Sequence, residues 1–232
     1  MGKNNGCLII HGFGGSVHEV SPLAAYLQER GYQVICPTLK GHTGRKKDLR
    51  EVTYDDWLTS AEEGLLQLIS SCDRVFVIGF SMGGLIAMNL GIKYKIHGLV
   101  TINSPIYYWN LKRICLNIIN GFKKRDYRNI RRYLKASRNI PLAALFQFKS
   151  LLLKTKPIIK NIKCPLLVIQ TIDDDTVRSD SANYIYKKAD TEKKKLKFYE
   201  QGGHLALRSI AAQSIMEDVR TFFGEIEEIA QD

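Results

Sequence analysis

Short apolar runs alternate with amphipathic stretches along most of the chain, and this alternation restricts the fold more than any other feature. The apolar runs predict β-strands near residues 7–11, 33–37, 74–80, 98–103, 164–171 and 195–200. The amphipathic stretches predict helices near 21–30, 54–70, 82–94, 179–188 and 210–223. A strand-then-helix rhythm is typical of a mostly parallel sheet with helices on both faces, so the expected fold class is α/β.

The rhythm is interrupted between residues 104 and 162. There the tract YYWNLKRICLNIINGFKKRDYRNIRRYL has its apolar residues at helical rather than strand spacing. Because this tract lies between two expected core strands, we interpret it as a helical insertion. The predicted organisation is an α/β core formed by residues 1–104 and 161–232, with a small helical cap, or lid, at residues 105–160.

The net charge of +11 is concentrated in the expected cap. Residues 105–163 contain 15 Lys or Arg and a single acid, Asp126, whereas the rest of the chain contains 19 basic and 22 acidic residues. Such a cap could contact an anionic membrane surface, or it could be a solvated lid whose apolar stripe covers an active site. No nucleic-acid partner is expected, because the charge is confined to the cap and no nucleic-acid-binding module is recognisable.

Other features of the composition indicate a cytoplasmic protein without disulfides or a zinc site. The polar start MGKNNG lacks the apolar core of a secretory signal, and the longest apolar runs fall far short of the ~20 residues that span a bilayer. The five cysteines are odd in number, widely spaced and form no C-x-x-C pair.

The segment RVFVIGFSMGGLIAMNLG carries the strongest functional signal. It places a G-x-S-x-G pattern, residues 79–83, between a β-branched apolar run and an amphipathic helix. This is the context of a nucleophile elbow, in which the chain turns sharply from strand to helix and lifts the serine to the helix N-terminus. Ser81 is therefore the predicted nucleophile, and a glycine-rich turn with a chance serine is the alternative.

A serine hydroxyl needs a base to remove its proton, and the chain has five histidines. His204 follows a strand-like run, precedes the last expected helix, and fits the chain order Ser, acid, His. His11 and His42 precede the nucleophile in the glycine-containing loops HGFGG and LKGHTG, where imidazole can hydrogen-bond to the backbone. His204 is the predicted general base.

The acid that orients this histidine is expected at the end of a strand between Ser81 and His204. The run PLLVIQTIDDDTV offers Asp173, Asp174 and Asp175 together. One of the three would hold the imidazole tautomer and the others would form the turn, but composition does not choose among them.

The oxyanion that develops on a substrate carbonyl needs two backbone donors. The N–H of Met82, directly after the nucleophile, is expected to supply one, and that of Phe13 in the loop HGFGG the other. A phosphate-binding loop is the competing interpretation of HGFGG, but the segment lacks the Lys and Ser/Thr of a P-loop and the spacing of G-x-G-x-x-G. No metal or organic cofactor is implied.

The motifs HGFGG, P-x-L-x-G-H, GFSMGG, VIQ-x-x-x-D-x-x-V-x-x-D-S-A and YEQGGH together resemble those of the bacterial carboxylesterase and monoacylglycerol lipase branch of the α/β-hydrolases. The resemblance covers nearly the whole chain and implies the α/β-hydrolase fold with a small helical cap. It also implies Ser81 as nucleophile, His204 as base and the backbone of Phe13 and Met82 as oxyanion hole. Since the acid of that family lies three residues before an apolar position, D-x-x-V, the resemblance selects Asp174.

The expected activity is hydrolysis of carboxylic esters, either of short- to medium-chain acyl groups or of monoacylglycerols, through an acyl-enzyme intermediate. Thioesterases, acyltransferases and C–C hydrolases use the same triad, and a ligand receptor could be built on the same scaffold. An intact triad argues against a pure receptor. The sequence leaves the physiological substrate, the acyl-chain length and the oligomeric state open.

Overall fold

The computed structural model of the protein describes residues 4–107 and 140–229. Six strands form one sheet in the order β2-β1-β3-β4-β5-β6, and every neighbouring pair is parallel. The strands are β1 (Asn5–Ile10), β2 (Gln33–Ile35), β3 (Arg74–Phe80), β4 (Gly98–Ile102), β5 (Leu166–Thr171) and β6 (Lys194–Tyr199). The predicted α/β class is confirmed, and the central strand β3 has the predicted bounds.

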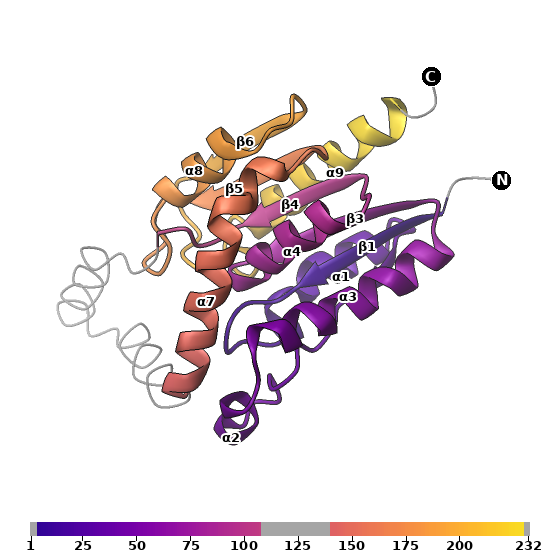
Figure 1. Cartoon of the computed structure of the whole chain (residues 1–232). Helices are drawn as coiled ribbons and strands as arrows, with labels where there is room; N and C mark the ends of the chain where they lie inside the picture. The colour runs from indigo at the N-terminus through magenta and orange to yellow at the C-terminus, as the bar shows by residue number, and fades with distance from the viewer. Residues whose placement is uncertain (1–3, 108–139, 230–232) are drawn as a thin grey trace.

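Helices cover both faces of the sheet (Figure 1). They are α1 (Ser21–Gln28), α2 (Lys46–Arg50), α3 (Tyr54–Ser71), α4 (Met82–Lys93), α7 (Leu142–Ile158), α8 (Asp180–Lys188) and α9 (Ala212–Ile229), with 3₁₀ turns η1 (Val17–Glu19), η2 (Ile159–Asn161) and η3 (Ala206–Arg208). None of the helices in the described ranges is long and apolar enough to cross a membrane.

Two hydrophobic cores lie on opposite faces of the sheet because successive side chains of a strand point to opposite sides. In β3, Val75 and Val77 pack into the core shared with α3, α4, α7 and α8. Phe76 and Ile78 pack into the core shared with α1 and α9. All seven residues of β3 are buried, which explains why this strand appears in the sequence as a continuous apolar run.

Helix α9 runs beyond its predicted end at residue 223, through Gly224 to Ile229. Tertiary contacts hold this extension. The Glu227 side chain accepts hydrogen bonds from Tyr32 and from Asn5 Nδ2, and the Glu227 carbonyl accepts one from Arg74. These contacts to the start of the sheet offset the low helix propensity of glycine, which is the reason the sequence pattern ends the helix too early.

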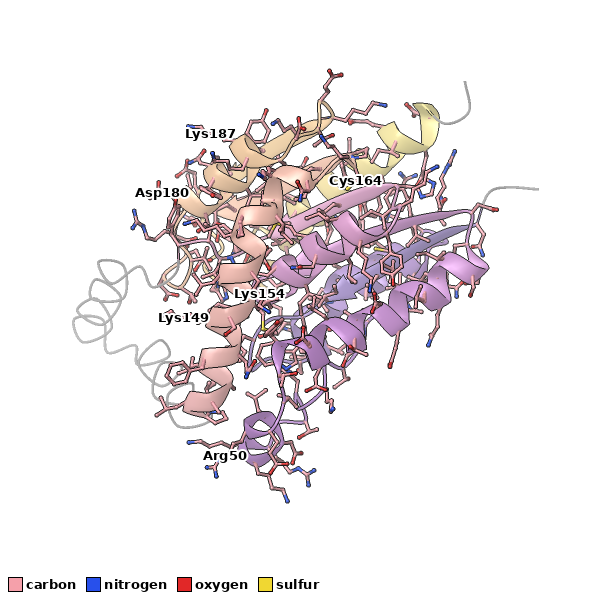
Figure 2. All side chains as sticks on the ribbon, viewed as in Figure 1. Arg50, Lys149, Lys154, Cys164, Asp180 and Lys187 are labelled. Carbon is pink, nitrogen blue, oxygen red and sulfur yellow. The ribbon has the colours of Figure 1, made fainter. Side chains whose placement is uncertain are left out.

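The predicted cap falls mostly on residues 108–139, which lie outside the described residues, so its boundaries stay a prediction. Helix α7 belongs to the described part of that segment and packs against α3 and α4, where Asn89 Nδ2 donates to Thr155 Oγ1 at 2.7 Å. Lys149 and Lys154, two of the basic residues of the segment, are exposed on α7 (Figure 2).

The strand order places the loops after β1 and β3 side by side. Strand β1 lies between β2 and β3, so the chain changes direction across the sheet at this point. Parallel α/β sheets bind ligands beyond the carboxyl ends of their strands at such a switch point. The loop HGFGG follows β1, and Ser81 follows β3 directly.

Candidate active site

Ser81 lies in a strained turn between β3 and α4. Its φ of 53° and ψ of −122° are outside the regions that residues with a side chain ordinarily adopt. Two backbone hydrogen bonds hold it there: Ser81 N–H donates to Ile102 O at 2.9 Å, and Gly84 N–H donates to Ser81 O at 2.9 Å. This is the backbone geometry of a nucleophile elbow, and strain of this kind gathers at functional sites.

Glycines around Ser81 allow the elbow to pack tightly against its neighbours. A Cβ at Gly79 would lie 2.2 Å from the carbonyl O of Gly83. A Cβ at Gly83 would lie 2.2 Å from the carbonyl O of Ile10 and 2.8 Å from that of His11. Because these neighbours are backbone atoms of the sheet and helix, only glycine fits at both positions.

Replacement of Gly83 by alanine is expected to destabilise the fold by more than about 3 kcal/mol, because the end of β1 cannot move away from the added Cβ. Urea unfolding of the purified protein measures this change. Gly91→Ala in the same helix is the control: its Cβ would meet only side-chain ends, the nearest being Ile96 Cδ1 at 3.1 Å. Its stability should stay within about 1 kcal/mol of wild type, and equal loss in both variants would contradict the packing argument.

Two hydrogen bonds of the His204 ring connect Ser81, His204 and Asp174. His204 Nε2 lies 3.0 Å from Ser81 Oγ, and His204 Nδ1 lies 2.8 Å from Asp174 Oδ2. The Asp174 side chain is fully buried, and its other oxygen accepts the N–H groups of Thr176 at 2.7 Å and Val177 at 3.0 Å. An acid bonded in this way holds the imidazole with Nδ1–H toward the carboxylate, so that Nε2 is the atom that accepts the serine proton.

The three consecutive aspartates have different partners. Asp174 bonds to His204, whereas Asp173 accepts the N–H groups of Gly202 at 3.2 Å and Gly203 at 2.7 Å. Asp175 Oδ1 accepts the hydroxyl of Thr176 at 3.0 Å. The structure therefore brings to the histidine Asp174, the aspartate that the family resemblance selects through D-x-x-V. The side chains of Asp173 and Asp175 instead accept hydrogen bonds within the surrounding loops.

Asn103 is a residue of the site that the sequence analysis missed. It is fully buried at the end of β4 with φ of 47°, and its Nδ2 lies within 3.0 to 3.1 Å of Thr171 Oγ1, Gly203 O and His204 O. Its Oδ1 accepts the Thr171 N–H at 2.9 Å. Asn103 thus ties the His204 loop to the ends of β4 and β5. An asparagine at a strand end, a residue type that tolerates positive φ, was the available signal.

Of the two predicted oxyanion-hole residues, Met82 follows Ser81 directly, and Phe13 follows Gly12, which packs against Ser81. Met82 begins α4, so its N–H belongs to the positive end of that helix. Gly12 of the HGFGG loop packs against Ser81, since a Cβ at Gly12 would come within 3.2 Å of Ser81 Cβ. The ring of the adjacent Phe13 is stacked on Phe148 of α7, with centroids 5.2 Å apart. The structure brings the Phe13 loop and the start of α4 to the serine.

His11 and His42 bond to backbone, as their loops suggested. His11 Nδ1 lies 2.9 Å from Gly12 O, and His11 Nε2 accepts the Leu39 N–H at 3.3 Å. His42 Nδ1 lies 3.3 Å from Lys40 O. Burial lowers the pKa of both histidines, and for His42 burial together with the neighbouring His11 lowers the pKa to about 4. Both imidazoles are therefore neutral near pH 7 and hold the two loops.

Comparison with known proteins identifies the family of this chain. The model of the alpha/beta hydrolase family matches residues 7–213. The chain is 30% identical to the thermostable monoacylglycerol lipase of Bacillus sp. strain H-257 over 231 residues, which cover 95% of this chain and 90% of the lipase. It is 27% identical to a carboxylesterase of Bacillus subtilis strain 168 over 233 residues, which cover 97% of this chain and 95% of the esterase.

Solved structures show the same fold. A chain from work on the metagenome-derived lipolytic enzymes LipS and LipT superposes with a TM-score of 0.81 at 21% identity, covering 97% of this chain and 95% of that one. A soluble variant of monoglyceride lipase from Saccharomyces cerevisiae superposes with a TM-score of 0.73 at 18% identity. The superposition covers 97% of this chain and 88% of the lipase. With its parallel sheet, its strained serine turn and a family match over most of its length, this chain belongs to the α/β-hydrolase family.

Proposed function

We propose that the protein is a serine hydrolase of carboxylic esters, in which Ser81 is the nucleophile, His204 the general base and Asp174 the residue that orients the histidine. The observation that carries the proposal is the pair of hydrogen bonds that connects Asp174 to His204 and His204 to Ser81. A serine with such a base and a buried acid has the arrangement needed for nucleophilic catalysis at a carbonyl.

In the proposed reaction, Ser81 Oγ attacks the ester carbonyl while its proton passes to His204 Nε2. The N–H groups of Phe13 and Met82 stabilise the oxyanion of the tetrahedral intermediate. His204 then gives the proton to the departing alcohol, which leaves an acyl group on Ser81 Oγ. Water, deprotonated by the same imidazole, attacks this acyl-enzyme and releases the carboxylic acid.

The proposed substrates are monoacylglycerols and esters of short- to medium-chain acids. The support is the similarity to relatives named monoacylglycerol lipase and carboxylesterase over nearly the whole length of both chains. We also propose that residues 105–160 form a cap over the site. Its described residues support this, because Phe148 of α7 stacks on Phe13, and the side chain of Ile140, which precedes α7, would lie 3.3 Å from a Cβ at Gly14.

A panel of acyl substrates tests this proposal. Hydrolysis of p-nitrophenyl esters from acetate to palmitate and of monoacylglycerols is measured beside matched acyl thioesters, with Ser81→Ala as the blank. We expect serine-dependent turnover of esters, with the optimal chain length reporting the depth of the acyl pocket. Absence of ester turnover from the folded protein would overturn the proposal, and a much higher kcat/KM for thioesters would assign a different leaving group to the same triad.

A further inference from the structure

Glu19 is a carboxylate beside the site to which the proposed mechanism gives no role. It ends the 3₁₀ turn η1, and its Oε2 accepts the N–H of Gly12 at 3.0 Å. A Cβ at Gly12 would come within 3.2 Å of both Glu19 Oε2 and Ser81 Cβ. A single glycine therefore separates the Glu19 carboxylate from the proposed nucleophile.

The HGFGG loop is folded around this carboxylate. Gly15 N–H donates to Gly12 O at 3.3 Å, which closes a β-turn that includes Phe13. A Cβ at Gly15 would lie 2.2 Å from Glu19 Oε2 and 2.3 Å from its Cδ and Oε1, so the carboxylate fills the space that a side chain there would occupy. Glu19 thus fixes both ends of the turn, by a hydrogen bond at Gly12 and by packing at Gly15.

The charge of Glu19 also acts on the histidine. Burial raises the pKa of the Glu19 carboxyl, and the Gly12 N–H and the positive charge of protonated His204 both oppose that rise. The attraction is mutual, so an ionised Glu19 favours the imidazolium form of His204. His204 becomes an imidazolium when it takes the proton of Ser81, and a nearby negative charge stabilises that state.

We infer that Glu19 is a positioning residue of this site: through Gly12 it fixes the turn that presents the Phe13 N–H, and its negative charge favours protonated His204. The inference rests on the proposed function, because it gives Glu19 a part in the same reaction. The two carboxylates then have separate tasks. Asp174 bonds to the imidazole and fixes its tautomer, and Glu19 sets the loop and adds negative charge.

The other titratable groups of this region are retained when Glu19 alone is replaced. Asp174 is bonded to Nδ1, and Asp173 and Asp175 lie in the same turn after β5. In the described part of the chain, Arg208 of η3 donates to the carbonyl of His18, and the buried His11 bonds to the carbonyl of Gly12. A difference between wild type and a Glu19 variant therefore reports on Glu19.

The test compares Glu19→Gln, which keeps the size and an acceptor oxygen but removes the charge, with Glu19→Ala, which removes both. At pH 8 we expect kcat for a p-nitrophenyl ester to fall about 10-fold in the Gln variant and about 100-fold in the Ala variant, with KM changed less than about twofold. Loss of the negative charge lowers the pKa of His204. The acid limb of kcat/KM should therefore move to lower pH by about half a unit in the Gln variant.

NMR titration of the His204 imidazole supplies a measurement that does not depend on turnover, with the signal assigned by its loss in His204→Gln. We expect the same downward shift of the pKa in Glu19→Gln. The matched control is Glu29→Gln, which removes an equal charge from a largely exposed side chain at the end of α1. Its kcat and its His204 titration should both equal those of wild type.

Two results would overturn the inference. One is wild-type kcat and wild-type His204 pKa in Glu19→Gln. The other is activity lost only in proportion to the unfolded fraction, with the His204 pKa unmoved, which is the behaviour of a merely structural residue. If wild type itself hydrolyses no ester, the proposed function fails, and the NMR titration still decides whether the Glu19 charge acts on His204. If Glu19→Ala does not fold, Glu19→Gln alone decides.

Discussion

The Ser81→Ala protein is expected to hydrolyse esters about 10⁴- to 10⁶-fold more slowly than wild type while keeping its fold. Without Oγ no acyl-enzyme forms, and His204 has no hydroxyl to deprotonate. Alanine adopts the strained φ of this turn about as readily as serine does, and the backbone bonds to Ile102 and Gly84 are retained. The loss should therefore lie in kcat and not in the melting temperature.

Initial rates with p-nitrophenyl butyrate and a thermal melt measure the two quantities. Ser70→Ala is the control, because Ser70 is exposed on α3 and its hydroxyl donates to Gln67 O in its own helix. It should match wild type in both measurements. Turnover within tenfold of wild type from folded Ser81→Ala would remove the proposed nucleophile.

Replacement of Asp174 by asparagine should lower kcat about 10³- to 10⁴-fold. The Thr176 and Val177 N–H groups fix one oxygen of this side chain as their acceptor, so an asparagine would turn its NH₂ toward His204. Facing a donor, Nδ1 must become an acceptor, and the proton moves to Nε2. The imidazole then presents N–H to Ser81 and no longer accepts its proton.

Asp173→Asn and Asp175→Asn are the matched variants, because they remove the same charge from the two neighbouring positions. An asparagine at 173 can still accept the Gly203 N–H through its amide oxygen, and one at 175 can still accept the Thr176 hydroxyl. Each should lower kcat by less than about tenfold, since neither changes the tautomer of His204. If either of them is the most damaging of the three, the role of the acid belongs to that residue.

The strand and helix pattern of the core was readable from the sequence because the sheet is buried on both faces. The bounds of β3 follow directly from its apolar run, whereas the end of α9 depends on contacts of Glu227 with residues at the start of the sheet. The helix propensity of Gly224 carries no information on these contacts of Glu227.

The residues of the site divide in the same way. The order of Ser81 and His204 relative to strands and helices predicts these two residues, and the family resemblance, through D-x-x-V, predicts Asp174. The structure links the three side chains by hydrogen bonds. Asn103 and Glu19 were missed because their partners are the backbone groups of other loops, and no local spacing records such contacts.

Covalent labelling tests the central claim, that Ser81 is the nucleophile, most directly. An alkyl p-nitrophenyl phosphonate is incubated with the protein, and tryptic peptides are examined by mass spectrometry. Cleavage after Arg74 and Lys93 yields residues 75–93, which contain one serine, Ser81, and no threonine, cysteine, tyrosine or histidine. We expect one phosphonyl group per protein on this peptide, with release of one p-nitrophenolate and no label on His204→Ala. Stoichiometric label on any other peptide, with loss of ester turnover, would contradict the account.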